Sequence, residues 1–349
     1  MDKARIIKWG IIGAGDVCEK KSGPGFYKAP GSELAAISKR NSEAAADFAK
    51  RHNVSRWYTQ PEELINDPEV DAVYIATPPH LHRKFAELAM RAGKPVLVEK
   101  PMATSASECD AMIECSIETG AALWVAYYRR GLEKFVKIKE AIDSGSIGEP
   151  RSVVVELSQD RARYAAASGE VPWRVNPATA GAGIIADMGS HMLDLIDWFL
   201  GPISPVSSLA SNLAGDYTAE DIVAAAFTTR SAGGASQEST RQSSYVIGTA
   251  LWDFTGRRET DRTVIRGSEG TIEYSCFDDA PVLIIKDGET KEMEQKPFPP
   301  HVHQPLIELI NDEIRGGSKA PSTAASGART NRVLEALVSG YYSRAKRSE

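Results

Sequence analysis

Lys100 stands where a side chain could act on a bound ligand, because it follows an apolar segment with the pattern of a buried strand. Val96, Leu97 and Val98 are typical of a parallel strand covered on both faces. Ligands of open α/β sheets bind outside the carboxyl ends of such strands. The alternative is a solvated lysine ahead of the loop proline Pro101. The position favours a lysine that faces a cofactor cleft.

Asp187, His191 and Asp194 form a second group that could do chemistry. They fall at i, i+4 and i+7 of a predicted helix and therefore share one face. A polar stripe on a largely apolar helix is solvated, paired or catalytic. The alternative to a catalytic role is a structural histidine that is hydrogen-bonded to a carboxylate one turn away. An ion held by Asp187 and His191 is another, but no third or fourth ligand is evident, so we expect no metal.

A glycine-rich turn near the N-terminus indicates which cofactor such a cleft would hold. The apolar segment Ile6–Ile12 leads into Gly13–Cys18, which reads GxGxxC where the dinucleotide fingerprint has GxGxxG or GxGxxA. The first two glycines let backbone amides approach a pyrophosphate, and the third position needs only a small side chain. We therefore predict a dinucleotide site rather than an ordinary turn. Its contacts would come from Gly13, Gly15, Asp16 and Val17.

The end of the next predicted strand, 34–38, bears on the choice of coenzyme. Sites selective for NAD usually place an acidic residue there, which binds the ribose hydroxyls and repels a 2′-phosphate. This chain has Ser38, Lys39, Arg40 and Asn41 instead. Lys39 or Arg40 could pair with the phosphate and Ser38 could donate a hydrogen bond to it. The pattern favours NADP(H) over NAD(H), although two solvated surface charges would look the same.

The elements that would position these residues alternate between strand and helix. Helices are expected at 44–51, 58–66 and 83–92, and further strands at 72–76 and 121–128. This alternation predicts a doubly wound parallel sheet. After a helix at 132–144, more closely spaced strands indicate a second, largely antiparallel sheet. These strands are expected at 152–157, 222–229, 245–254, 263–266, 270–274 and 282–286.

We therefore expect an α/β protein of two domains, at 1–128 and 129–349, whose C-terminal helices from Gln304 pack back on the first domain. The second domain would bind substrate and mediate oligomerisation. A broad sheet face without a helix after each strand suggests a homo-oligomer, either a dimer or a tetramer. A small polar tract at 231–239 is expected to form a turn or loop.

Composition excludes several classes of partner. The 349 residues have 41 Lys and Arg against 47 Asp and Glu, a net charge of −6, so no basic excess favours nucleic acid or an anionic membrane. No stretch approaches the length of a membrane span or a signal peptide. The four cysteines show no CxxC pairing, which suits reduced thiols. We expect a cytoplasmic protein that acts on a small molecule.

Four segments together resemble the Gfo/Idh/MocA family of oxidoreductases. They read GIIGAGDV, IATPPHLH, VLVEKP and GAGIIADMGSHMLDLIDWFLG, and they occur in the family's order over nearly the whole chain. The resemblance implies a Rossmann domain followed by an α/β domain on an open sheet, and NAD(P)-dependent oxidation or reduction of sugars, polyols and related carbonyl compounds. Ser38–Asn41, the Trp173–Arg174 pair and the tail of the second domain are most similar to NADPH-using members such as 1,5-anhydrofructose reductases.

The resemblance also implies roles for particular residues. Lys100, Asp187 and His191 match the family's lysine and its DxxxH pair. His191 would exchange the substrate's hydroxyl proton near neutral pH, and Lys100 would stabilise the developing alkoxide. Asp187 would orient His191 or a substrate hydroxyl. Lysine or histidine could be the formal acid, and we favour histidine.

Further contacts are expected on the strand-end and loop segments. Those to the cofactor would come from Thr77, Pro78, His82, Glu99 and Lys100. Those to the substrate would come from Tyr128, Arg163, Tyr164, Trp173, Arg174 and His301. The chain departs from the family at Ala182, the middle position of what is usually a run of three glycines, and at Tyr128, where asparagine is usual. These departures bear on the shape of the cleft and not on the class of reaction.

Two other functions fit the same scaffold. An NAD-dependent glycosidase would oxidise and then reduce its sugar again with one retained cofactor. A non-catalytic nucleotide-binding regulator would normally lack Lys100 or His191, and both are present. The two residues therefore favour an enzyme.

Overall fold

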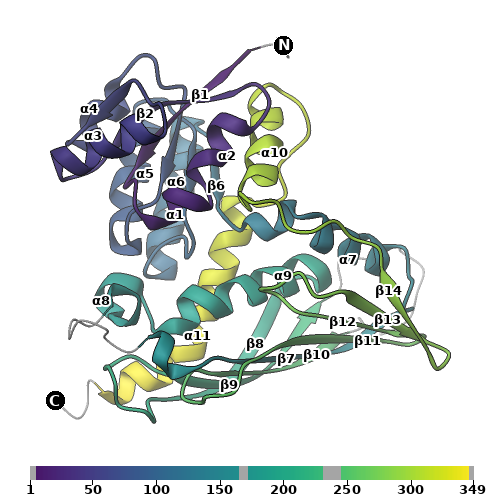
Figure 1. Ribbon diagram of the computed structural model, residues 1–349. Coiled ribbons are helices and arrows are strands. Elements are labelled where there is room, and N and C mark those ends of the chain that lie inside the picture. Colours follow the sequence, from purple (N-terminus) through teal and green to yellow (C-terminus); the bar gives the residue numbers. More distant parts are fainter. Residues whose placement is uncertain (1–4, 165–171, 231–244, 346–349) are drawn as a thin grey trace. The chain divides into compact units, whose positions relative to one another are not determined.

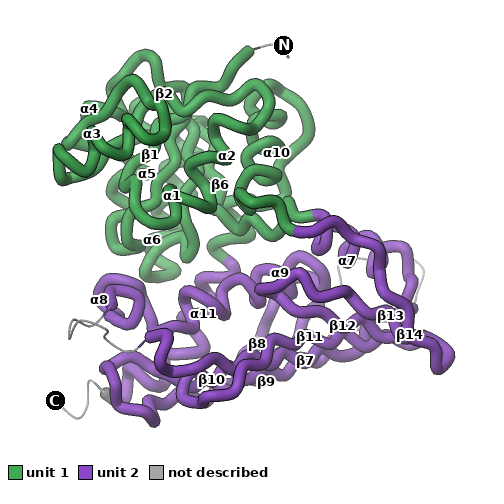
Figure 2. The backbone as a smooth tube through the Cα atoms, in the orientation of Figure 1, with its two compact units in different colours: residues 1–132, 298–328 green, residues 133–297, 329–349 purple. Residues whose placement is uncertain are grey.

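The computed structural model describes residues 5–164, 172–230 and 245–345, and these fall into two compact units (Figure 2). Unit 1 comprises residues 1–132 and 298–328, and unit 2 comprises 133–297 and 329–349. The polar tract at 231–239 lies outside the described residues. No helix in the described ranges combines the length and apolar character that crossing a bilayer requires.

Unit 1 is built on a six-stranded parallel sheet with the order β3-β2-β1-β4-β5-β6. This is the predicted doubly wound fold. The strands are β1 (Ile7–Ile12), β2 (Ser32–Ser38), β3 (Arg56–Tyr58), β4 (Ala72–Ile75), β5 (Val96–Val98) and β6 (Leu123–Val125). The order reverses at β1 and β4, so the carboxyl ends of these two strands flank the switch point where such sheets bind ligands.

Helices cover both faces of this sheet (Figure 1). On one face, Trp9 and Tyr74 each lie 5.0 Å from the ring of Phe26 in α2 (ring centroids), and the Trp9 indole donates to Asn311 of α10. On the other face, α4, α5 and α6 bury an aliphatic core. Gly10 faces that side, where a Cβ would stand 2.6 Å from Leu64, so glycine allows α4 to pack closely.

Capping signals mark both ends of α6 (Ala106–Thr119). The side chain of Ser105 accepts the backbone N–H of Glu108 at the start of α6, and Gly120, with φ of 70°, ends that helix. The helix predicted at 58–66 begins only at Pro61, because Tyr58 belongs to the short strand β3. The helices are α1 (Asp16–Lys20), α2 (Gly23–Lys28), α3 (Ser42–Arg51), α4 (Pro61–Asn66), α5 (His82–Arg91), α6 (Ala106–Thr119) and α10 (Gln304–Ile314).

Unit 2 is built on an eight-stranded sheet with the order β14-β13-β12-β11-β7-β10-β9-β8. The β7–β10 pair is parallel and the other pairs are antiparallel, so the sheet is mixed and mostly antiparallel, as predicted. Two strands at its edges, β8 and β14, were not predicted. The strands are β7 (Pro150–Ser158), β8 (Ile203–Ser211), β9 (Ile222–Arg230), β10 (Tyr245–Asp253), β11 (Thr260–Gly267), β12 (Thr271–Tyr274), β13 (Val282–Lys286) and β14 (Glu289–Met293).

One face of this sheet is covered and the other is exposed. Along β10, Val246, Ala250 and Trp252 are buried, whereas the alternating Ile247 and Leu251 are exposed. Helix α9 covers the inner face and is buried along most of its length. The helices of unit 2 are α7 (Glu133–Asp143), α8 (Pro177–Ala180) and α9 (Ser190–Leu200), while α11 (Ala324–Ala345) begins in unit 1 and ends in unit 2.

Candidate functional site

The loop after β1 has the geometry that a dinucleotide requires. Gly13 has a φ of 85°, and a Cβ there would stand 2.8 Å from the Cγ2 and backbone N of Thr77, so only glycine fits. A Cβ at Gly15 would meet nothing closer than 3.8 Å, which leaves open space above its backbone. The Thr77 hydroxyl is buried and has no hydrogen-bond partner among the described residues. A cradle with an unsatisfied polar atom fits a bound pyrophosphate.

Two cations lie at the end of β2, beside this loop. The Ser38 carbonyl accepts the backbone N–H of Gly13 at 3.0 Å, which ties the strand end to the glycine turn. Lys39 and Arg40 follow Ser38, and neither joins an ion pair with any described residue. Asn41 caps α3 by accepting the N–H of Ala44. The strand end therefore offers positive charge and no carboxylate.

His82 connects the loops that follow β4 and β5. Its fully buried imidazole faces the Thr77 carbonyl through Nε2 at 2.8 Å and the Pro101 carbonyl through Nδ1 at 3.1 Å. Burial lowers the pKa of His82, against the opposing effect of these carbonyls. Pro78, next to Thr77, precedes the 3₁₀ turn Pro79–Leu81 that leads into α5. His82 thus holds the strand-end loops on which Thr77 and Lys100 lie.

Glu99, directly before Lys100, is a buried carboxylate with a full set of donors. Its oxygens accept hydrogen bonds from the Tyr74 hydroxyl, from Nε2 of His303 at 2.9 Å and from the Lys100 backbone N–H at 3.1 Å. Burial by itself would raise the pKa of Glu99. The His303 hydrogen bond, the Lys100 ammonium and the Tyr74 hydrogen bond outweigh it and hold the pKa below its usual value. A fixed negative charge therefore lies beneath the lysine.

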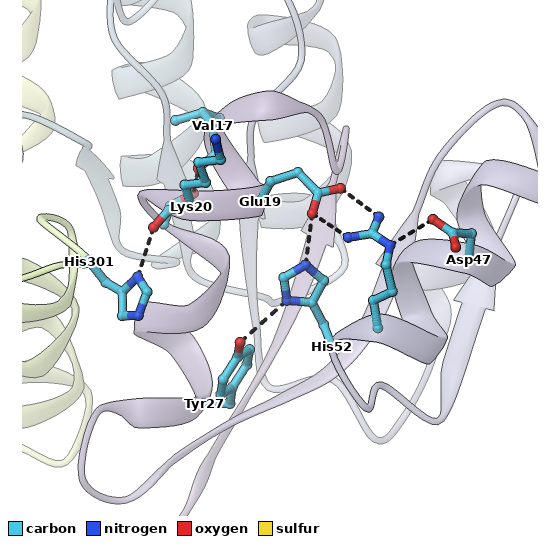
Figure 3. A network of polar contacts seen from close by, with 9 residues as sticks. Val17, Glu19, Lys20, Tyr27, Asp47, His52 and His301 are labelled. Carbon is cyan, nitrogen blue, oxygen red and sulfur yellow. Dashed lines mark hydrogen bonds and ion pairs between the residues drawn. The ribbon is translucent and has the colours of Figure 1, made fainter.

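His301 lies at the C-terminal end of α1, the helix that follows the glycine turn (Figure 3). Its Nδ1 is 2.8 Å from the Lys20 carbonyl and its Nε2 is 2.8 Å from Nζ of Lys28. These contacts fasten residues 298–304 to unit 1. The structure thus places this predicted substrate contact beside the cofactor-side helices.

A second network in the same view joins α1 to α3 (Figure 3). Glu19 accepts two hydrogen bonds from Arg51, at 2.6 and 2.8 Å, and lies 3.0 Å from Nε2 of His52. The Arg51 hydrogen bond is the largest cause that lowers the pKa of Glu19 to about 2. The network fixes the helix that follows the glycine turn relative to the helix that follows the Lys39–Arg40 pair.

In unit 2, the segment before α9 is a π-helical turn, Ile185–Gly189, and not the regular helix that the spacing predicted. Asp187 lies in this wider turn, and its carboxylate is 3.4 Å from Nε of Arg174. The Arg174 guanidinium stacks 4.6 Å from the ring of Trp173, which is 39% exposed. Three predicted site residues therefore lie together. π-Helical turns occur often at functional sites.

The glycines before this turn explain why Ala182 is tolerated. Gly181 has a φ of 88°, and a Cβ at Gly183 would stand 2.4 Å from the Glu220 carbonyl oxygen. Buried Glu220 accepts the Gly183 N–H at 2.6 Å through its side chain. The middle position needs neither a positive φ nor a close backbone approach, so alanine fits there.

His191, one turn into the helical segment, is 5% exposed and meets Phe277 edge to face at 6.1 Å between ring centroids. The loop that bears Phe277 is anchored from two sides. Asp261 accepts the backbone N–H of Phe277 at 2.6 Å, and fully buried Lys134 donates to the carbonyls of the loop at 2.9 and 3.0 Å. A rigid aromatic wall therefore borders the imidazole.

The remaining predicted residues lie in different surroundings. Tyr164 donates to Gln159 and packs edge to face on Phe254, and burial raises its pKa. Arg163 pairs with Glu259 at 2.5 Å at the surface. Tyr128 is buried at the end of the sheet of unit 1, 4.4 Å from the ring of His303.

Sequence reasoning missed His303, Tyr74 and Phe277. The only sequence signal for His303 was its spacing, two positions after His301. The other two were indistinguishable from core aromatics. Among the described residues, no cluster of three or more His, Cys, Asp or Glu side chains is arranged to hold a metal ion.

The six-stranded parallel sheet and the glycine cradle at its carboxyl edge define a dinucleotide-binding Rossmann fold. The family model for Gfo/Idh/MocA oxidoreductases with that fold matches residues 7–127, and the model for the family's C-terminal domain matches residues 135–273. The chain belongs to the Gfo/Idh/MocA family.

Relatives agree with this assignment. An oxidoreductase of Formosa agariphila is 33% identical over 94% of this chain and 97% of its own. A 1,5-anhydro-D-fructose reductase of Ensifer adhaerens is 28% identical over 92% of each chain. The structure of a levoglucosan dehydrogenase in complex with NADH superposes with a TM-score of 0.79 at 23% identity, over 95% of this chain and 96% of the other.

Proposed function

We propose that this oxidoreductase uses NADP(H) in preference to NAD(H) and transfers a hydride to or from a carbon of a sugar, anhydro-sugar or polyol. The proposal rests chiefly on the position of Lys100. This residue lies two positions after β5, at the sheet edge where Gly13 and Thr77 leave a dinucleotide cradle. The relatives named for levoglucosan and 1,5-anhydro-D-fructose support the carbohydrate class.

The chain's residues would supply the proton chemistry. A bound nicotinamide coenzyme would give the hydride to a carbonyl carbon, or take it from a hydroxyl-bearing carbon. In reduction, His191 donates the proton that the carbonyl oxygen gains, and the Lys100 ammonium hydrogen-bonds the same oxygen as negative charge develops. The Asp187 carboxylate lies beside Arg174, where it can accept a hydrogen bond from a substrate hydroxyl. The proposal requires Lys100 and His191 to act on one oxygen.

The other contacts follow from the same placements. Gly13, Gly15, Asp16, Val17, Thr77 and Pro78 would border the coenzyme, with His82 and Glu99 as positioning residues. Trp173 would stack on the apolar face of a ring, with Tyr128, Arg163, Tyr164, Arg174 and His301 as further substrate contacts. The preference for NADP(H) rests on Lys39 and Arg40, which pair with no carboxylate in the part of the chain that the structure describes, and on Ser38 beside them.

The decisive experiment is a screen of aldoses, ketoses, inositols and anhydro-sugars with both coenzymes. Turnover is measured by the near-ultraviolet absorbance of the reduced nicotinamide. Turnover should appear with at least one class. Lys100→Ala should lower kcat about 10²- to 10³-fold. Lys84→Ala removes an equal charge from an exposed ion pair on α5 and should leave kcat unchanged. Full turnover by Lys100→Ala would remove the lysine from the mechanism.

The screen also separates the rival glycosidase. That activity would release sugar from a glycoside with coenzyme retained and no net change in absorbance. Net reduction or oxidation of free coenzyme in step with product excludes it for the substrate tested.

We further propose that the exposed sheet face of unit 2 packs against a second copy of the chain. Leu209 on β8 is 75% exposed, and it pairs in register with Ala224 on β9, which pairs with Leu251 on β10. These side chains form an apolar row on one face of three strands. A flat apolar row of this kind can pair with its own copy about a twofold axis.

A further inference from the structure

The Glu99–His303 pair lies at the end of β5 and has no role in the proton chemistry above. The side chains are 9% and 2% exposed, and Nε2 of His303 is 2.9 Å from Oε1 of Glu99. Because Glu99 is held as a carboxylate, it can only accept, so Nε2 of His303 must bear the proton. In the neutral imidazole the other ring nitrogen, Nδ1, is then a hydrogen-bond acceptor.

The imidazole is fixed by more than this one bond. Its ring lies 4.4 Å from the ring of Tyr128, which follows β6. The backbone N–H of His303 points to the Lys21 carbonyl, at 3.4 Å, at the end of α1. The ring therefore has a set orientation beside the ends of β5 and β6, and the direction of its Nδ1 lone pair is set with it.

Nδ1 of His303 is buried and has no hydrogen-bond partner among the described residues. Leaving a buried polar atom unsatisfied destabilises the folded state, so such atoms are uncommon in folded proteins. The Thr77 hydroxyl, at the end of β4, is in the same condition. Two unsatisfied atoms thus lie at the carboxyl edge of one parallel sheet, where ligands of this fold bind.

We propose that Nδ1 of His303 accepts a hydrogen bond from a small molecule bound at this sheet edge. The inference rests on the proposed function. Two neutral donors have the required chemistry: the amide N–H of the nicotinamide carboxamide and a hydroxyl of the carbohydrate-like substrate. Glu99 supports either contact by keeping the ring's proton on Nε2.

Two substitutions separate the two ring nitrogens. Glutamine at 303 can place its amide near the position of Nε2 and still donate to Glu99, but it offers nothing at Nδ1. Asparagine is shorter, so its amide can stand near the position of Nδ1 but cannot reach Glu99. His303→Gln should therefore keep the thermal stability of the wild type and lose ligand affinity about tenfold. His303→Asn should lose stability and keep more of the affinity.

Two measurements determine whether the coenzyme carboxamide or a substrate hydroxyl is the donor. Coenzyme dissociation constants are measured by nicotinamide fluorescence, with the 3-acetylpyridine analogue, which lacks the amide N–H. If the carboxamide is the donor, wild type and His303→Gln should bind that analogue equally and differ for the natural coenzyme. If a hydroxyl is the donor, the coenzyme constants agree and KM rises, except for the deoxy-substrate that lacks that hydroxyl.

The inference is overturned if His303→Gln changes neither the coenzyme constant nor KM by more than twofold while the wild type turns over. A wild type that binds neither coenzyme overturns the proposed function as well, and the first titration shows this without any variant. Should His303→Gln fail to fold, ¹⁵N-histidine spectra of the wild type decide the matter. The Nδ1 resonance of His303 must then move on addition of ligand, and an unmoved resonance refutes the contact.

Discussion

Arg40→Ala should weaken NADPH binding selectively. Lys39 and Arg40 have no carboxylate partner among the described residues, so a 2′-phosphate would be the anion that Arg40 pairs with. Hydrogen bonds to charged groups contribute about 1.5–3 kcal/mol. Arg40 is exposed, so solvent places its contribution near the lower end, a loss of about tenfold in affinity. NADH lacks the phosphate, and its dissociation constant should change less than about twofold.

Lys50→Ala is the matched control, because it removes the same charge from the far end of α3. Eight residues separate Lys50 from the helix start at Ser42, a rise of about 12 Å. This exceeds the Debye length of about 8 Å at physiological salt. The control should leave the ratio of the two coenzyme constants unchanged, and added salt should weaken NADPH binding more than NADH binding. An unchanged ratio in Arg40→Ala and in the Lys39→Ala/Arg40→Ala double variant would refute the phosphate contact.

Four further outcomes are expected. Gly13→Ala should lower stability by about 1–3 kcal/mol, because alanine is strained at positive φ and would clash with Thr77. Gly15→Ala should fold normally, as seen in urea unfolding, but raise the coenzyme dissociation constant. Glu19→Gln should cost about 1–2 kcal/mol at neutral pH. Since the folded pKa of about 2 lies below the unfolded value, the difference in urea midpoint from wild type should shrink as the pH falls from about 5 to 2. Ile247→Lys, at a 61% exposed position, should lower the mass of the oligomer measured by sedimentation, whereas Lys291→Ala on the edge strand should not. An Ile247→Lys variant with the same mass as the wild type would refute the sheet interface.

The parallel sheet was predictable because its strands are short apolar segments that end in loop signals. Gly13 has a positive φ in the fingerprint loop, and Gly93, also at positive φ, follows the helix predicted at 83–92. Strand β8 escaped prediction because Ser207 and Ser208 interrupt its alternation. Strand β14 escaped because Glu289–Met293 is almost wholly polar and lies at an edge.

Only those site residues that belong to a short sequence motif could be predicted. Lys100 and Asp187 stand in recognisable motifs, but Gly183, just before the π-helical turn that bears Asp187, is held by Glu220, which lies 37 positions along the chain. His303 reaches Glu99 across 204 positions of sequence. No local pattern reports such a contact, because periodicity and capping signals extend over a few residues only.

The anchoring of the Phe277 loop has a consequence for how the enzyme matures. Lys134 and Ser275 are 141 positions apart and meet in the buried interior at 3.1 Å. Closing so long a segment costs entropy that nearby contacts cannot offset until both ends are held. Pairing of β11 with β7 brings the two ends of that segment together, so the wall beside His191 should form only once the sheet of unit 2 has assembled.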